Sequence, residues 1–362
     1  MKKINSLLNC RSPFKRCRWK FNDRLIMIFT FIFSISLYYT IFIFQSNSFE
    51  LHSSNVIISL TSTPERFHYE LPFAIHSLLS QTQLPKQIRI YLSSTPVSIR
   101  QKNLTLRHLK TYIKRLDLSK ITEKLFNKLV QIRLEEEDYG PTIKFLPIIK
   151  EFQSKSQAIM ICDDDQYYHP YASATLNKYS TKYENSIIGF RGWRVREDLI
   201  WGVEGKYEIG YHVIEFQYLS EVYRVGVLTA NYGYLIRSSF FDFHIYQDFN
   251  QVSGDIRHVD DIWLNGQASK LNIPRYVIPS CCSHIEVTRT HVLEQYFDRN
   301  QMNRLSANNH ALQWFINNWE KNLWYRFQGE NGPKYRSWQM MIYREWINFI
   351  LKLKFIFYFG VI

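Results

Sequence analysis

Apolar positions along this chain form short, strand-like runs that alternate with stretches of helical spacing. The short runs are β-branched or alternate with polar residues, and polar breakers bound them. They predict strands at residues 55–61, 87–94, 130–134 and 158–162. Helical spacing predicts helices at residues 71–80, 98–129 and 142–152, and we expect Pro147 to kink the last of these. Because strands that alternate with helices pair in parallel, the pattern predicts an α/β fold whose sheet is buried on both faces.

One longer apolar run, Leu25–Phe44, has a different meaning. It contains no Asp, Glu, Lys or Arg, and as a helix it would extend about 30 Å, the thickness of a bilayer's hydrocarbon core. A cleaved signal peptide would have a shorter apolar region and a small-residue cleavage site. Residues 1–24 hold eight Lys or Arg and one acid, so the positive-inside rule keeps them in the cytosol. We predict a single-pass type II membrane anchor, with everything after about residue 45 on the luminal or outer side.

Length and charge limit the other possibilities. With 362 residues and 46% hydrophobic content, the chain can form one large core or two smaller ones. The formal net charge is +13, but residues 1–24 carry +7 of it and no nucleic-acid-binding motif is recognisable, so we expect no nucleic-acid partner. We divide the chain into a basic tail 1–24, a transmembrane segment 25–44, a stem 45–55, a main domain 56–285 and a C-terminal helical extension 286–362. The apolar end, residues 346–362, is either an interfacial membrane helix or a core-packed element.

The cysteines and the sequon agree with this topology without deciding it. Cys10 and Cys17 would be cytosolic, as free thiols or palmitoylated. Cys162 ends a predicted strand, and we expect a buried small hydrophobe. For Cys281–Cys282, a vicinal disulfide, free thiols and a bond to a distant cysteine all stay open. The single Asn-x-Ser/Thr sequon, at Asn103, would be usable in a lumen.

The strongest chemical signal is the acidic run Asp163–Asp165, which directly follows the strand predicted at 158–162. Three adjacent carboxylates repel one another unless a cation compensates them. Oxygen ligands suit Mg²⁺ or Mn²⁺, and Asp163 and Asp165 have the reach to hold a diphosphate-bound cation, with Asp164 between them. The alternative is an inert, solvated loop, but a buried strand that leads into three Asp favours the metal site.

Two further sites carry chemistry. Gly140 and Lys144 lie where a loop leads into a helix N-terminus, a geometry that favours anionic groups and predicts contact with the nucleotide, although a simple helix start after Pro141 explains them equally well. Asp260 and Asp261, the acid pair, begin a predicted helix. Acids stabilise a helix N-terminus by about 0.3–1 kcal/mol, but a single Asp would serve that purpose.

Several segments, in this order, resemble family-2-like glycosyltransferases. They are residues 58–66 (ISLTSTPER), 74–82 (AIHSLLSQT), Pro85, 88–92, 140–144 (GPTIK), 163–170 (DDDQYYHP), 190–192 (FRG) and 258–264 (HVDDIWL). The resemblance covers roughly residues 55–285. It implies a GT-A-like, Rossmann-type sheet, a nucleotide-sugar donor that we expect to be UDP-linked, a Mn²⁺ or Mg²⁺ cofactor, and a glycan, protein or lipid acceptor. With the membrane anchor, it predicts a Golgi or ER membrane protein whose catalytic domain is luminal.

The resemblance also implies roles on the donor side. It places Asp163 and Asp164 at the nucleotide, and Asp163 and Asp165 at the metal, where the late His284 would complete the shell. It places the turn after the first strand beside the nucleotide base, through Thr61, Pro64, Glu65 and Arg66. A surface ion pair between Glu65 and Arg66 is the alternative.

On the acceptor side, the resemblance implies that the acid pair supplies a catalytic base. We favour Asp261, with Asp260 as the second choice, because a carboxylate within hydrogen-bond reach of the acceptor hydroxyl can remove its proton. Such a base implies inverting transfer. Residues 229–237 would line the acceptor side, where Trp193 and Tyr232 either stack on sugar rings or pack in the core. The competing function is a catalytically silent glycan-binding protein on the same scaffold.

Overall fold

The computed structural model describes residues 52–93, 105–116, 120–201, 213–280, 284–286, 303–321 and 332–337, with the single positions 342 and 349. The chain divides into two units, Met1–Glu50 and Leu51–Ile362, and all described residues belong to the second. The predicted transmembrane segment, Cys10, Cys17, Asn103 of the sequon, Cys281–Cys282 and, except for position 349, the apolar end 346–362 lie outside the described residues. Within the described residues, no helix is long and apolar enough to span a bilayer.

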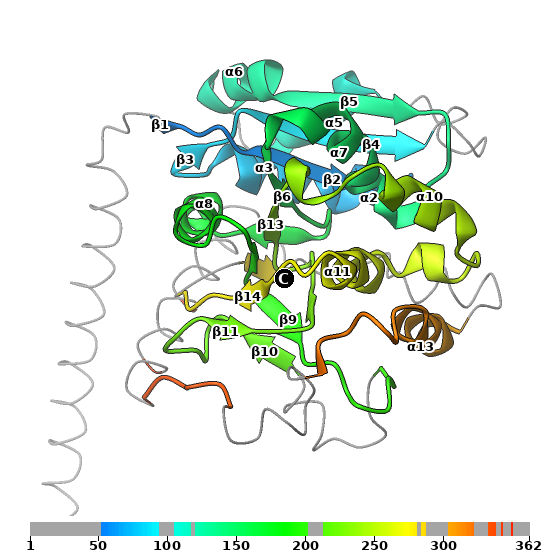
Figure 1. The fold of residues 1–362 in the computed structure, drawn as a ribbon. Coiled ribbons are helices and arrows are strands. Elements are labelled where there is room, and N and C mark those ends of the chain that lie inside the picture. The colour runs from blue at the N-terminus through cyan, green and yellow to red at the C-terminus, as the bar shows by residue number, and fades with distance from the viewer. Residues whose placement is uncertain are drawn as a thin grey trace, which may run out of the picture. The chain divides into compact units, whose positions relative to one another are not determined.

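An eight-stranded mixed sheet lies at the centre of the second unit (Figure 1). Its strands lie in the order β11 (Tyr223–Arg224), β14 (Arg275–Val277), β8 (Ile187–Gly189), β13 (Tyr234–Arg237), β6 (Ala158–Ile161), β2 (Ile57–Thr61), β4 (Gln87–Ser93) and β5 (Val130–Glu135). Strands β5, β4, β2 and β6 pair in parallel, β14 pairs in parallel with β8, and β13 is antiparallel to both β6 and β8. The predicted α/β class with a largely parallel sheet is confirmed.

The central strands have the burial that their sequences predict. Ile57, Ile58 and Leu60 of β2 are fully buried, as are Ile159, Met160 and Ile161 of β6. A parallel strand covered on both faces reads as a continuous apolar run, and this explains why these strands were predictable to within one or two residues. Cys162, just after β6, is free and buried, as predicted.

Three smaller sheets accompany the central one. They are β10 (Val213–Glu215), β9 (Arg191–Trp193) and β12 (Val227–Leu228) in one; β7 (Gln166–Tyr168) with β15 (His284–Glu286) in another; and β1 (His52–Ser53) with β3 (Gln83–Leu84). The β7–β15 pair brings residue 284 beside the strand that follows the acidic run.

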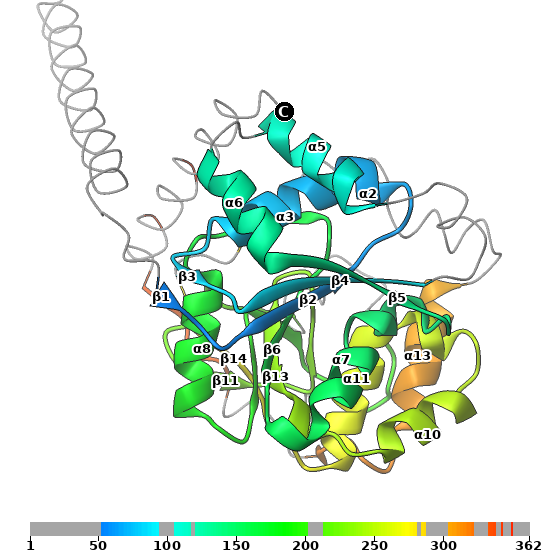
Figure 2. The ribbon, with the colours of Figure 1, turned by 90° about the horizontal axis from the view of Figure 1, so that it is seen from above.

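Helices cover both faces of the strands β2 and β4 (Figure 2). On one side lie α2 (Arg66–Tyr69), α3 (Leu71–Leu79), α5 (Leu106–Leu116) and α6 (Lys120–Leu129); on the other lie α7 (Leu146–Phe152), α10 (His244–Gln251), α11 (Asp260–Lys270) and α13 (Arg304–Trp314). The remaining elements are α8 (Ala172–Lys182) and the 3₁₀ turns η1 (Gly140–Lys144), η2 (Gln153–Lys155), η3 (Ser238–Phe240) and η4 (Ile256–His258).

Two helix predictions need correction. The helix predicted at 98–129 is two helices, α5 and α6, in its described part. The helix predicted at 142–152 is the 3₁₀ turn η1 followed by α7, and Pro147 lies in the first turn of α7. A first-turn proline gives up no intrahelical hydrogen bond, so Pro147 starts this helix and does not kink it.

The segment after the predicted boundary at residue 285 belongs to the same packed unit. Helix α13 lies against α11, and a Cβ on Gly266 would come within 2.1 Å of the Phe315 ring, so only glycine permits this approach. Further on, Glu320 pairs with the fully buried Arg275 and, at 2.8 Å, with Arg224. Residues 303–321 therefore help to hold α11, the helix that carries the acid pair.

Candidate active site

The site lies at the edge of the sheet where the parallel strands β2 and β6 end. The turn after β2 leads to Arg66 at the start of α2, and the acidic run Asp163–Asp165 follows β6. Because the carboxyl ends of adjacent parallel strands share one edge, these two segments meet, although almost a hundred residues separate them. The sequence placed both segments at strand ends, and the structure confirms that placement.

Arg66 is the cation that compensates two acids of the acidic run. Its Nη1 donates to Asp164 Oδ1 at 2.9 Å, and its Nη2 lies 3.4 Å from Asp165 Oδ2, with all three side chains buried. Burial lowers the pKa of Arg66, but Asp164 and Asp165 raise it by more, so the guanidinium stays charged. The alternative of a surface ion pair with Glu65 does not describe Arg66, which is buried while Glu65 is exposed.

Asp164 has a second partner from the turn after β2. The Ser62 hydroxyl donates to Asp164 Oδ2 at 2.5 Å. Burial nevertheless raises the pKa of Asp164 above its ordinary value, against the opposing effects of Arg66 and Ser62. On the other side of the run, Gln166 Nε2 donates to Asp165 Oδ1 at 3.1 Å. The sequence did not mark Ser62, because nothing local to the turn reveals a partner that lies in another strand's loop.

The rest of that turn faces the neighbouring strand or solvent. Thr61 Oγ1 donates to the Tyr91 carbonyl on β4 at 2.8 Å, and the Arg66 amide donates to Thr63 Oγ1 at 3.3 Å. Pro64 lies in the turn and Glu65 at the N-cap of α2. Contact of Thr61, Pro64, Glu65 and Arg66 with a nucleotide base stays a prediction.

The backbone of the acidic run is anchored by Tyr168, which is fully buried on β7. Its hydroxyl accepts from the Asp163 amide at 2.9 Å. Strand β15 pairs with β7 so that residue 284 lies opposite Tyr168. The backbone of His284 therefore runs beside the strand that continues the acidic run, and its role as a metal ligand stays a prediction.

Lys144 connects the acidic run to the acid pair. Its Nζ lies 2.7 Å from Asp163 Oδ1 and 2.6 Å from Asp260 Oδ2, and its side chain is 4% exposed. Burial lowers the pKa of Lys144, but Asp163, Asp260 and Asp261 together raise it well above the ordinary value. We expected this residue at an anion-binding helix N-terminus; the structure places its charge between two carboxylates.

Gly140 allows the turn that carries Lys144 to fit. Its φ of +57° lies in the left-handed region that glycine tolerates, and a Cβ there would lie 3.3 Å from the Arg257 carbonyl. The turn η1 can thus pack closely against η4, directly before α11. Gly140 in this way has a structural role, and its predicted contact with nucleotide is untested.

Asp261, the second residue of α11, has a different environment from Asp260. Both of its carboxylate oxygens accept from the Ala230 amide, at 3.2 Å each. Burial and then the neighbouring charge of Asp260 raise the pKa of Asp261 well above the ordinary value, although Lys144 opposes this. A carboxyl whose pKa is raised in this way binds a proton more tightly than an ordinary Asp, which is a property required of a general base.

Two residues that the sequence did not single out support the acid pair. Asn265, one turn along α11, donates to the Asp261 carbonyl at 2.7 Å and makes two 3.0 Å hydrogen bonds with the Leu228 backbone. The Tyr234 hydroxyl is buried near Asp261, Lys144 and Asp260 and, within the described ranges, has no hydrogen-bond partner. Asn265 could not be predicted, because its partner Leu228 lies on another element. Tyr234 lies within residues 229–237, which we expected to line the acceptor side.

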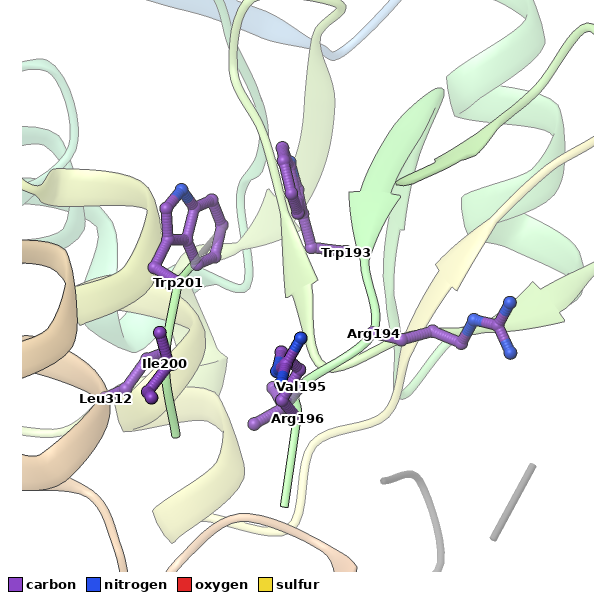
Figure 3. A pocket seen from close by; sticks show the side chains of 7 residues that line it. All are labelled: Trp193, Arg194, Val195, Arg196, Ile200, Trp201 and Leu312. Atoms are coloured by element: carbon purple, nitrogen blue, oxygen red, sulfur yellow. The ribbon is translucent and has the colours of Figure 1, made fainter. Parts of the chain in front are cut away.

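The predicted sugar-stacking residues pack against other side chains. The Trp193 ring lies 4.5 Å from that of Trp201 and 5.4 Å from the Arg191 guanidinium, which also lies 5.3 Å from the Tyr232 ring. Both tryptophans line a small pocket (Figure 3). Its volume of about 10 Å³ has room for one water molecule, not for a sugar ring. For Trp193, the geometry therefore favours packing against other side chains over stacking on a sugar ring.

The residues at this site have the chemistry for a divalent cation. Among the residues that the structure describes, Arg66 contacts Asp164 and Asp165, and Lys144 contacts Asp163 and Asp260, with Asp261 next to Asp260 on α11. Fully ionised, the cluster keeps an excess of negative charge, and carboxylate oxygens are the ligands that Mg²⁺ and Mn²⁺ prefer. Within the described ranges, however, no three His, Cys, Asp or Glu side chains are grouped to hold a metal ion.

No protein-family model matches this chain, and no curated protein is similar to it in sequence. Among solved structures, apo UDP-glucose pyrophosphorylase is similar with a TM-score of 0.39 and 10% identity over 74% of this chain and 98% of that one. The same enzyme complexed with UDP-glucose gives 0.38 and 11%, over 74% and 99%. GalNAc-T7 with UDP, GalNAc and Mn²⁺ gives 0.40 and 14%, over 63% and 42%. These similarities are too distant to support an argument about this chain.

Proposed function

We propose that the chain is a metal-dependent glycosyltransferase that moves a sugar from a nucleotide-sugar, UDP-linked, to a hydroxyl acceptor. One observation carries this proposal: three segments that the sequence singled out separately converge on one site. Arg66 joins the turn after β2 to the acidic run, and Lys144 joins the acidic run to the acid pair. A glycan-binding protein needs no such convergence of acids.

On the donor side, Asp163 and Asp165 are the proposed metal ligands, with His284 as the third. The divalent ion, Mn²⁺ or Mg²⁺, would neutralise the charge of the departing diphosphate. Asp163 is the member of the run with the most exposed side chain, at 28%, so it is the one most open to a ligand. Asp164 and the turn Thr61–Arg66 form the proposed nucleotide side of the site.

On the acceptor side, Asp261 is the proposed base. It takes the proton of the acceptor hydroxyl while the sugar's bond to the diphosphate breaks on the opposite face. A single in-line displacement inverts the anomeric centre, so an α-linked donor yields a β-linked product. Proton NMR of the fresh product reads this from the anomeric coupling constant, and an α product from an α donor would remove Asp261 from the mechanism.

Nucleotide release by the purified full-length protein tests the function. We expect UDP release from one member of a nucleotide-sugar panel with Mn²⁺, faster with an acceptor present, and none with excess chelator. The Asp163→Asn/Asp165→Asn variant is the inactive control, and the exposed Asp198→Asn is the matched active one. A silent glycan-binding protein would bind glycans and release no nucleotide, and a phosphorylated acceptor would indicate a phosphotransferase.

The sequence also supports a location in the Golgi or ER membrane, with the type II topology described above. Protease added to intact microsomes should remove only the basic tail 1–24. Digestion of the large unit in sealed vesicles would contradict this topology, and detergent-opened vesicles provide the control in which the whole chain is accessible.

A further inference from the structure

Lys144 is a buried lysine that contacts carboxylates from two different segments of the chain. Its ammonium group lies within hydrogen-bond distance of both Asp163 and Asp260, at 2.7 and 2.6 Å. The ammonium donates a hydrogen bond to Asp163 and makes an ion pair with Asp260, and the Lys144 side chain is only 4% exposed. The nucleotide contact suggested by its position in the sequence is not what this geometry favours.

The backbone around Lys144 is held from both sides. The Ser59 hydroxyl of β2 donates to the Lys144 carbonyl, which fixes the residue to the central sheet. The next residue, Phe145, stacks on Trp263 of α11, with ring centroids 6.1 Å apart and an interplanar angle of 10°. Lys144 is therefore part of the contact between the sheet and α11.

The two acids of the pair contact different groups. Asp260 binds the Lys144 ammonium, whereas Asp261 accepts only from a peptide N–H, that of Ala230, among the residues that the structure describes. Adjacent positions on a helix point in different directions, so one acid faces the acidic run and the other faces the loop after β12. A residue that fixes the first acid also fixes the orientation of the second.

We propose that Lys144 is a positioning residue that ties the acidic run to α11 through Asp163 and Asp260, and so places Asp261 to receive the acceptor proton. This inference rests on the proposed function, because it assigns a division of roles within the same site. A catalytic group that is misplaced by 1 Å can lower the rate about 10²-fold. We expect the loss of the bridge to displace α11 by less than this, and so to lower the rate about tenfold.

A mutant cycle with kinetic readouts tests the bridge in the full-length protein. The variants are Lys144→Met, Asp260→Asn and their combination, and the exposed Lys150→Met on α7 is the matched control. We expect each bridge variant to lower kcat about tenfold with donor affinity weakened by no more than about threefold. The double variant should be no slower than either single one, because the same bridge can be broken only once. Multiplying losses, or a Lys144→Met that loses donor affinity and keeps kcat, would overturn the proposal.

Unfolding in urea provides a readout that needs no activity. Lys144→Met leaves buried carboxylates without their cation, and Asp260→Asn removes one of them. Each single variant should increase the unfolding equilibrium constant. In the double variant this constant should be at least tenfold smaller than the value obtained by multiplying the two single increases. Additive effects would overturn the bridge. If Lys144→Met does not fold, the double variant should regain folding, and its failure to do so counts against the bridge. If the wild type transfers no sugar, the proposed function fails while this cycle still decides the contact.

Discussion

The acidic run and the acid pair use the same residue type and differ in their partners. Each acid of the run contacts a cation: Asp163 contacts Lys144, and Asp164 and Asp165 contact Arg66. In the acid pair, Asp260 shares Lys144, and Asp261 has no cationic partner among the described residues. Adjacent acids in the sequence therefore differ in whether a cation lies beside them, and we expect their contributions to differ accordingly.

We expect the acids that contact a cation to affect mainly the stability of the fold, and Asp261 to affect mainly turnover. Buried carboxylates that are paired with Arg66 hold the two strand ends together, and breaking such a pair leaves uncompensated charge. Burial and the neighbouring charge of Asp260 raise the pKa of Asp261, so this carboxyl keeps its proton to a higher pH than an ordinary Asp. Changes in the run should therefore affect the free energy of unfolding most, and changes at Asp261 should affect turnover most.

The largest expected effect is that of Arg66→Met. It leaves Asp164 and Asp165 buried without their cation, and breaking a buried pair in this way costs about 3–5 kcal/mol. The free energy of unfolding in urea measures it, with the exposed Arg133→Met on β5 as the control, for which about 0.5 kcal/mol or less is expected. A loss for Arg66→Met as small as the control's would show that the run does not depend on this cation.

The next effect is on turnover at the acid pair. Asp261→Asn should lower kcat by roughly 10² or more, the usual contribution of a general base, with donor affinity nearly unchanged. Asp260→Asn should cost only about tenfold, because it loosens the Lys144 bridge and leaves the base in place. If Asp260→Asn has the larger effect, the roles of the two acids are reversed. If neither changes kcat, the pair is only a helix-start feature.

Much of the fold could be predicted because the strands of the parallel half are short runs that are either apolar or alternate with polar residues. Strands β2, β4, β5 and β6 match their predicted ranges to within one or two residues. Strands β8 and β14 have three residues each, which is too short for a periodic signal, and they were not predicted. The division of 142–152 into η1 and α7 depends on the packing of Gly140 against η4, which is a tertiary contact.

The acids of the site could be predicted from the sequence, but the partners of its two cations, Arg66 and Lys144, could not. Three adjacent Asp after a strand, and two at a helix start, are visible in the sequence. Arg66 and Lys144 were marked for contact with a nucleotide, but their partners come from loops that only the sheet order brings together. Asn265 and Ser62 were missed for the same reason, since their partners lie on other elements.

A smaller effect on stability is expected for Asp165→Asn, which sharpens the contrast within the run. Arg66 keeps its 2.9 Å contact with Asp164 in this variant, so the free energy of unfolding should change by about 1 kcal/mol or less. Metal-dependent donor binding should weaken by at least about tenfold, since a proposed ligand is lost. Calorimetric titration with Mn²⁺ and the donor measures this. An unchanged affinity in the folded variant would remove Asp165 from the metal site.

The last expected effect is a pH dependence that isolates Asp261. Its pKa in the folded protein is raised, mainly by burial, above the value of about 3.9 that an unfolded Asp has. The folded state therefore holds this proton more tightly, so the stability that the group contributes is present below the unfolded pKa and is lost as pH rises through the folded pKa. Asp261→Asn has no proton to lose there. Its free energy of unfolding, relative to the wild type, should rise with pH by up to about 1.4 kcal/mol per unit in that window and then level off.

Urea unfolding of both proteins without metal, from about pH 4 to pH 8, measures the difference, in which every other titrating group cancels to first order. A difference that stays flat would give Asp261 an ordinary pKa. One that falls with pH would mean that a cation stabilises its charge, and the contrast between the run and the pair would disappear.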